Sequence, residues 1–141
     1  MAAPLLFSHV ALSCADPART EQFYSQYFGF HRARTIPLGE GNEIVFLKNS
    51  RSVYLELFRA DAPQPAGLPR AEGDGPHYVG IRHLAFQVES VDATLATLGD
   101  TADVTLGPLD FDAFIPGWRT VWVRDPDGNI VEISQGYTDQ V

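Results

Sequence analysis

Ser8-His9-Val10-Ala11-Leu12-Ser13 and Arg82-His83-Leu84-Ala85-Phe86-Gln87 decide the fold, because they are one pattern written twice. Each reads polar residue, histidine, aliphatic residue, alanine, apolar residue, polar residue. Each is followed within a few residues by a helix-start signal, which is Asp16-Pro17 after the first segment and Ser90-Val91-Asp92 after the second. We therefore ask whether the rest of the chain repeats as well.

A second pair of matching segments lies further along each half. Tyr54-Leu55-Glu56-Leu57 and Ile130-Val131-Glu132-Ile133 are strand-like runs that each carry one carboxylate. The histidines are 83 − 9 = 74 residues apart and the glutamates 132 − 56 = 76, while the spacing from histidine to glutamate is 47 in one half and 49 in the other. Agreement in residue type, order and spacing indicates a duplicated module. The alternative is chance similarity between short apolar runs.

The elements expected in each half are a strand, a helix and three further strands. The first module, residues 1–58, is expected to contain strands near 5–12, 30–35, 43–48 and 52–58 and a helix over 17–28. The second module, residues 81–141, is expected to contain strands near 81–88, 102–106, 118–124 and 129–134 and a helix over 91–98. The stretch between them, residues 59–80, is rich in proline and glycine and is predicted to be a linker.

Strand alternation places the histidine and the glutamate of each half on a face of their own. Val10 and Leu12 lie on the face opposite His9, and the other candidate residues are separated from aliphatic neighbours in the same way. A carboxylate in the middle of such a strand is costly unless it is paired or bound. Two imidazoles and two carboxylates can share one cleft if a cation between them binds the ring nitrogens and compensates the charge of the carboxylates. We therefore predict one divalent metal ion, held by the side chains His9, Glu56, His83 and Glu132.

Each of these four residues also has an ordinary structural interpretation. A lone histidine is more often a hydrogen-bonded structural residue, and a lone glutamate is more often solvated or ion-paired. The repeat weakens these interpretations because it places all four residues at equivalent positions. Imidazole nitrogen and carboxylate oxygen without thiolate suit Ni, Co, Mn, Fe or Zn. On an octahedral ion, four protein ligands leave two positions for water or for two substrate oxygens.

The composition excludes several classes of partner. The net charge is −8, with a pI near 4.7, so the chain would repel nucleic acid and anionic membrane surfaces. No apolar run is long enough to predict a membrane-spanning helix. The single cysteine, Cys14, cannot form an intrachain disulfide, and we expect a reduced, cytoplasmic protein that binds a small molecule.

The quoted segments resemble the vicinal oxygen chelate superfamily, which includes glyoxalase I, methylmalonyl-CoA epimerase, extradiol dioxygenases and the fosfomycin and bleomycin resistance proteins. The resemblance covers nearly the whole chain and includes Phe7–Leu12, Phe23–Phe30, Arg82–Phe86 and Asp125–Ile133. It implies an α+β fold in which tandem βαβββ modules form a curled mixed sheet around a metal-binding cleft. It also implies a homodimer, with each site built from one chain or from two.

The resemblance favours a particular chemistry. Glyoxalase-type members use all four ligand positions, whereas extradiol dioxygenases typically lack a ligand at the position that Glu56 matches. We therefore expect a metal-dependent lyase or isomerase that transfers a proton next to a carbonyl, with Glu132 or Glu56 as the catalytic carboxylate. Substrate contacts are expected from the side chains Tyr54, Phe58, Gln87 and Trp122.

Two alternatives stay open at this point. The first is a non-haem Fe(II) extradiol-type dioxygenase that uses His9, His83 and Glu132. The second is a non-catalytic protein that binds a small molecule or antibiotic through stacked aromatic side chains.

Overall fold

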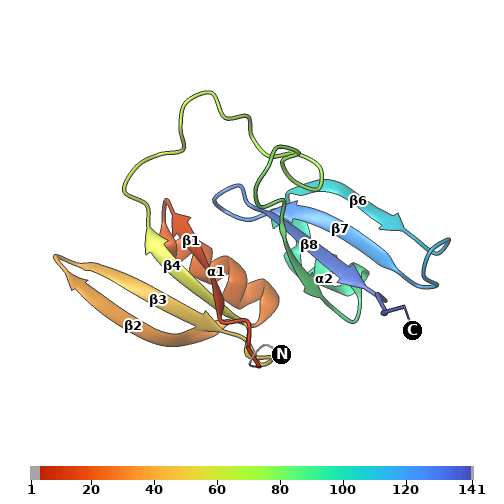
Figure 1. The fold of residues 1–141 in the computed structure, drawn as a ribbon, viewed down its shortest axis with the longest axis horizontal. Helices are drawn as coiled ribbons and strands as arrows, with labels where there is room; N and C mark the ends of the chain where they lie inside the picture. The colour runs from red at the N-terminus through yellow and green to blue at the C-terminus, as the bar shows by residue number, and fades with distance from the viewer. Residues whose placement is uncertain (1–3, 141) are drawn as a thin grey trace. The chain divides into compact units, whose positions relative to one another are not determined.

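The computed structural model of the chain describes residues 4–140, which divide into two compact units, one up to Ala66 and one from Gly67 (Figure 1). Both units have the element order strand, helix and three strands, and both contain one four-stranded sheet. In each sheet the first strand of the unit lies beside the last one, in the orders β1-β4-β3-β2 and β5-β8-β7-β6. The duplicated βαβββ module predicted from the sequence is confirmed.

The first unit contains the predicted elements, although its first strand begins at His9 instead of near residue 5. Its elements are β1 (His9–Cys14), α1 (Pro17–Phe28), β2 (His31–Gly39), β3 (Asn42–Lys48) and β4 (Tyr54–Arg59). Strand β2 is longer than the expected 30–35, because it forms a tight hairpin with β3. Glu40 and Gly41 form the two-residue turn with φ of 55° and 78°, as such hairpins require. Pro37 is tolerated inside β2 because that strand lies at the edge of its sheet.

The second unit repeats this arrangement. Its elements are β5 (Leu84–Gln87), α2 (Val91–Leu98), a short 3₁₀ helix η1 (Gly99–Thr101), β6 (Val104–Asp110), β7 (Arg119–Arg124) and β8 (Ile130–Gln135). Strand β5 begins later than the expected residue 81, so that His83 directly precedes the strand. The turn before β8 is fixed by Asp125, whose carboxylate accepts hydrogen bonds from the backbone N–H groups of Asp127 and Asn129, both at 2.9 Å.

One face of each sheet is buried under the helix of its own unit. In the first unit this face consists of the apolar residues Leu12, Cys14, Val45, Leu47, Leu55 and Leu57, with Phe23 and Tyr24 buried on α1. In the second unit it consists of Val121, Val123, Val131 and Ile133, with Val91 and Leu98 on α2. The opposite face of each sheet is left for His9 and Glu56 in one unit and for Glu132 in the other.

The helices begin at the predicted capping residues. The Asp16 carboxylate accepts a hydrogen bond from the Ala18 N–H at 3.1 Å, and the Ser90 hydroxyl accepts one from the Ala93 N–H at 3.0 Å. Helix α1 ends at Gly29, whose φ of 68° lies in the left-handed region that glycine tolerates best. Across the described part of the chain, neither of these helices nor any other is long and apolar enough to cross a membrane.

The Asp16 cap gives a first prediction. Asp16→Ala leaves the Ala18 N–H without its side-chain acceptor and should lower the free energy of unfolding by about 1 kcal/mol. Urea unfolding followed by circular dichroism measures this loss. Asp61→Ala is the matched control, because Asp61 is an exposed residue after β4 and outside any helix. An equal loss in both variants would mean that net charge, rather than the cap, sets the effect.

Candidate metal centre

His9 and Glu56 meet on the open face of the first sheet. Strands β1 and β4 run parallel, with Ala11 opposite Glu56, so that His9 stands one pleat before the glutamate on the same face. His9 Nε2 lies 3.2 Å from Glu56 Oε1. The glutamate side chain is only 15% exposed, so its carboxylate has lost much of its water and needs a compensating partner.

His83 and Glu132 form the same arrangement in the second unit. Strands β5 and β8 run parallel with Ala85 opposite Glu132, and His83 again precedes that alanine by two residues. His83 Nε2 lies 3.0 Å from Glu132 Oε1, and the glutamate side chain is 16% exposed. The duplication therefore extends from the sequence to the strand register and to the atoms that face each other.

The other ring nitrogen of each histidine fixes the ring's orientation. His83 Nδ1 lies 2.7 Å from the backbone carbonyl oxygen of Asp74, and His9 Nδ1 lies 2.8 Å from the Ser8 hydroxyl. A carbonyl can only accept, so His83 Nδ1 carries the proton and donates it to Asp74. In a neutral ring, His83 Nε2 then presents a lone pair to a carboxylate oxygen. Two acceptors at this distance need either a proton, on the ring or on the carboxyl group, or a metal ion between them.

The two pairs have a spacing that fits metal ligation. Imidazole nitrogen and carboxylate oxygen bind divalent zinc at about 2.0–2.2 Å, so two such donors at right angles around an ion lie about 3 Å apart. The measured separations of 3.2 Å and 3.0 Å are compatible with this value, and they fit a direct hydrogen bond between ring and carboxyl group equally well. Within residues 4–140, no group of three or more histidine, cysteine, aspartate or glutamate side chains gathers in a ligating arrangement. Each unit brings one histidine and one glutamate together.

An aromatic residue stands beside each pair at an equivalent position. Phe46 is opposite Glu56 on β3, and Trp122 is opposite Glu132 on β7. The His9 and Phe46 rings meet edge to face with centroids 5.7 Å apart, and the His83 and Trp122 rings do so at 6.4 Å. Sequence reasoning missed Phe46, although a signal was present, because 122 − 46 = 76 is also the spacing of the two glutamates.

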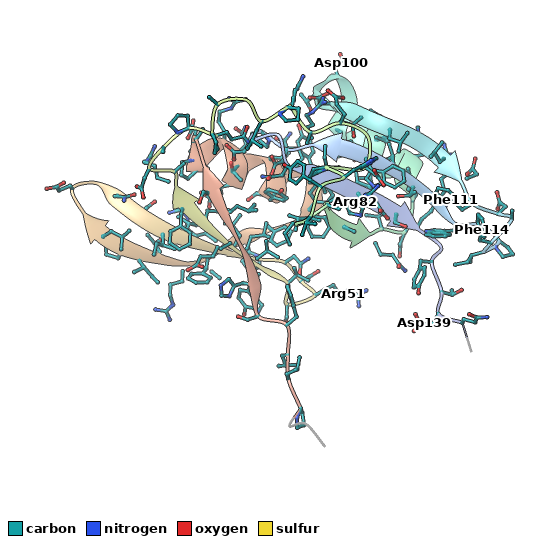
Figure 2. All side chains as sticks on the ribbon, turned by 45° about the horizontal axis from the view of Figure 1, so that its top comes forward. Arg51, Arg82, Asp100, Phe111, Phe114 and Asp139 are labelled. Carbon is teal, nitrogen blue, oxygen red and sulfur yellow. The ribbon has the colours of Figure 1, made fainter. Side chains whose placement is uncertain are left out.

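The loop that carries Asp74 is fixed by an ion pair of its own. The guanidinium of Arg82, labelled in Figure 2, donates to both Asp74 carboxylate oxygens at 3.1 and 3.2 Å. These hydrogen bonds, with help from His77, hold the pKa of Asp74 below its usual range, although burial of the carboxylate opposes the shift. Gly75 approaches Arg82 so closely that a Cβ there would lie 1.9 Å from the Arg82 carbonyl oxygen.

The same loop is bonded to the sheet through Arg124. Its buried guanidinium donates to the Ala71 carbonyl oxygen at 3.0 and 2.8 Å and pairs with Asp103 at 3.0 Å. Residues 71–75, which lie within the predicted linker 59–80, are thus attached to the second unit by side chains that sequence reasoning did not single out. The sequence gives only a weak indication of this attachment, because arginine and aspartate in a glycine-rich stretch are also typical of exposed loops.

Comparison with known proteins identifies the family of the chain. The sequence profile of the Glyoxalase/Bleomycin resistance protein/Dioxygenase superfamily matches residues 6–133. The chain belongs to this superfamily. The uncharacterized protein YwkD of Bacillus subtilis is 30% identical to it over 121 residues, which are 84% of this chain and 88% of YwkD.

Solved structures of the superfamily share the fold. A glyoxalase family protein from Enterococcus faecalis aligns with a TM-score of 0.67 and 28% identity, covering 92% of this chain and 96% of that one. The fosfomycin resistance protein FosX from Listeria monocytogenes, in its hexagonal crystal form, aligns with a TM-score of 0.68 and 17% identity. The alignment covers 97% of this chain and 96% of FosX, and at this identity the likeness shows the fold alone.

The residues expected to contact substrate lie on the same sheet face as the histidine or glutamate of their own unit. Tyr54 is the strand partner of His9, and Phe58 is the partner of Ser13. Gln87 is the partner of Ser134, one pleat beyond Glu132. Trp122, beside Glu132, is buried, and the part of the chain that the structure describes offers no hydrogen-bond partner to its indole Nε1.

The Asp74 loop gives a second prediction. Asp74→Ala removes the ion pair that holds the loop, so the Asp74 carbonyl should no longer select one tautomer of His83. Imidazole ¹⁵N–¹H NMR of the metal-free chain should show a hydrogen-bonded His83 Nδ1–H in the unmodified chain, and in the variant this proton should exchange faster with solvent.

Asp110→Ala is the control for this experiment. It also removes a carboxylate that binds one arginine through two oxygens, at Arg119, but it leaves the loop of Asp74 intact. The His83 signals should be unchanged in this variant. If Asp74→Ala left them unchanged too, the ion pair would have no part in positioning the ring.

Proposed function

We propose that His9, Glu56, His83 and Glu132 together hold one divalent metal ion, of the Ni, Co, Mn, Fe or Zn group, and that the protein is a glyoxalase-type lyase or isomerase. The observation that carries this proposal is the repeated pair of imidazole nitrogen and carboxylate oxygen, at 3.2 Å and 3.0 Å. Superfamily members are often metal-dependent enzymes, and membership supports the same reading.

The chemistry follows from what such a centre can supply. A divalent ion bound there would polarise a substrate carbonyl and stabilise negative charge that develops on its oxygen. A glutamate at the centre would take the proton from the neighbouring carbon and return it to an adjacent position. The substrate is a small molecule with two neighbouring oxygens.

Glu132 is our preferred base, and Glu56 is the other candidate. Glu132 faces the His83 imidazole, whose Nδ1 donates a hydrogen bond to the Asp74 carbonyl. This hydrogen bond restrains the ring, so that a movement of the Glu132 carboxylate would not turn the imidazole with it. His9 Nδ1 instead meets the hydroxyl of its neighbour Ser8, which can rotate. The second unit therefore offers a fixed imidazole beside which a carboxylate can move independently.

Trp122 supports a substrate position on the same side. Its indole N–H is a buried donor without a hydrogen bond in the described residues, and a donor in that state costs free energy. An oxygen of a bound substrate beside Glu132 would be a suitable acceptor. Tyr54, Phe58 and Gln87 would then line the remainder of the ligand faces.

Solvent deuterium exchange tests this proposal. The metal-loaded protein is incubated in D₂O with a panel of α-hydroxy ketones, 2-oxo aldehyde adducts and thioesters, and uptake at the carbon next to the carbonyl is followed by NMR. Removing the base should slow exchange by about 10²–10⁴-fold. We expect Glu132→Gln to show this loss, with the metal content measured in parallel.

Glu56→Gln is the matched variant, because it makes the same change in the equivalent position of the other unit. A larger loss in Glu56→Gln would exchange the roles of the two glutamates. Absence of metal-dependent exchange across the panel would contradict the isomerase and lyase proposal. Oxygen consumption with a catechol by the Fe(II)-loaded protein, retained in Glu56→Ala, would establish the dioxygenase instead.

A further inference from the structure

The face of the first sheet that carries His9 and Glu56 also carries two positive charges, and no carboxylate in the described residues pairs with them. Arg34 on β2 and Lys48 on β3 take part in none of the ion pairs recorded for residues 4–140. The chain has 10 lysines and arginines against 18 aspartates and glutamates, so carboxylate partners are plentiful. Arg19, Arg51 and Arg59 also lack an ion pair among these residues, and what distinguishes Arg34 and Lys48 is their place on the sheet face of Glu56.

A break in the strand register is what places Arg34 on this face. His31 is opposite Lys48 and Arg32 is opposite Leu47, but the next pair is Arg34 with Phe46, so that Ala33 is an extra residue on β2. Such a bulge redirects the side chains that follow it.

Its consequence is visible in the two arginines. Arg32 lies on the helix side, where its Nε donates to Glu21 of α1 at 2.9 Å. With regular alternation, Arg34 would lie on that side as well. Because of the bulge it shares the face of Phe46, which is the face of Glu56.

The two cations lie in two neighbouring rows of residues across the sheet. One row runs Ala11, Glu56, Phe46, Arg34, and the next runs His9, Tyr54, Lys48, His31, as the strand partners show. Strands are spaced about 4.8 Å apart, so the Arg34 backbone lies about 10 Å from that of Glu56.

Within these rows the two side chains can serve one ligand group. Arg34 and Lys48 are diagonal neighbours on paired strands, a relation that separates backbones by about 7–8 Å and lets long side chains meet. The Lys48 ammonium lies 5.4 Å from the centre of the Tyr54 ring, which directs it along the row toward His9. A small molecule that spans about 10 Å could therefore reach both charges and the His9–Glu56 pair at the same time.

We propose that Arg34 and Lys48 form an anion subsite that binds a carboxylate or phosphate group of the substrate. Arginine and lysine are suited to this because their charge-assisted hydrogen bonds to such groups are short and strong. The link to a substrate rests on the proposed function, since it places the reacting oxygens of the same molecule at the metal centre. The anion subsite itself needs no metal.

The test uses the full-length, metal-free chain with inorganic phosphate and, separately, acetate as probes. Titration is followed by ¹⁵N–¹H NMR of the Arg34 Nε–H and of the backbone N–H groups of Phe46 and Lys48. We expect saturable binding of the preferred anion, and a comparison of the two probes identifies the phosphate or the carboxylate class. Arg34→Gln and Lys48→Gln should each weaken binding about tenfold, as loss of one charged hydrogen bond implies.

Arg51→Gln is the matched control, because it removes the same charge from the same unit. Arg51 projects from the turn between β3 and β4 and is exposed (Figure 2). It should leave the affinity unchanged. Arg34→Lys, which keeps the charge but loses the two-pronged geometry, should fall between the unmodified chain and Arg34→Gln.

Two results would overturn the subsite. One is that neither anion binds saturably. The other is that Arg51→Gln weakens binding as much as Arg34→Gln, which would mean that only net charge matters. Neither result depends on metal binding, so failure of the subsite and failure of the metal centre are distinguishable. An anion that binds to a chain unable to hold metal would contradict the proposed function alone.

Discussion

The structure depends on one repeated constraint, which is a carboxylate oxygen facing an imidazole nitrogen about 3 Å away on the open face of each sheet. The carboxylates are largely withdrawn from water, and at least one imidazole has its only certain proton directed away from the carboxylate, toward the Asp74 carbonyl. Such a pair needs a proton or a metal ion between its two facing atoms. The duplicated scaffold, the strand register and the flanking aromatic rings all serve to present this arrangement twice.

The two units present it with different rigidity. In the second unit, Arg82, Asp74 and Arg124 attach the segment before β5 to the sheet, so that His83 is held by a backbone carbonyl. In the first unit, His9 Nδ1 meets the Ser8 hydroxyl instead, and the same face carries Arg34 and Lys48.

Much of this was predictable from the sequence, because the duplication could be read twice. The spacing of His9, Glu56, His83 and Glu132 predicted the two modules and the pairing within each, and Asp16 and Ser90 marked the helix starts. The extra length of β2 was not predictable, since Pro37 argues against a strand and only an edge position makes it tolerable. The bulge at Ala33 was not predictable either, because assigning side chains to alternate faces assumes that every strand residue has a partner on the neighbouring strand. The role of Asp74 lies in its carbonyl, a group that every residue possesses.

Metal stoichiometry of the purified full-length chain tests the central claim most directly. The unmodified chain is compared with a variant that lacks the first pair, His9→Ala with Glu56→Ala, and with one that lacks the second, His83→Ala with Glu132→Ala. After exposure to a limiting divalent metal and removal of excess, we expect one ion per chain in the unmodified protein and a near-complete loss in both variants. Two ions per chain, or one ion retained after removal of either pair, would contradict it.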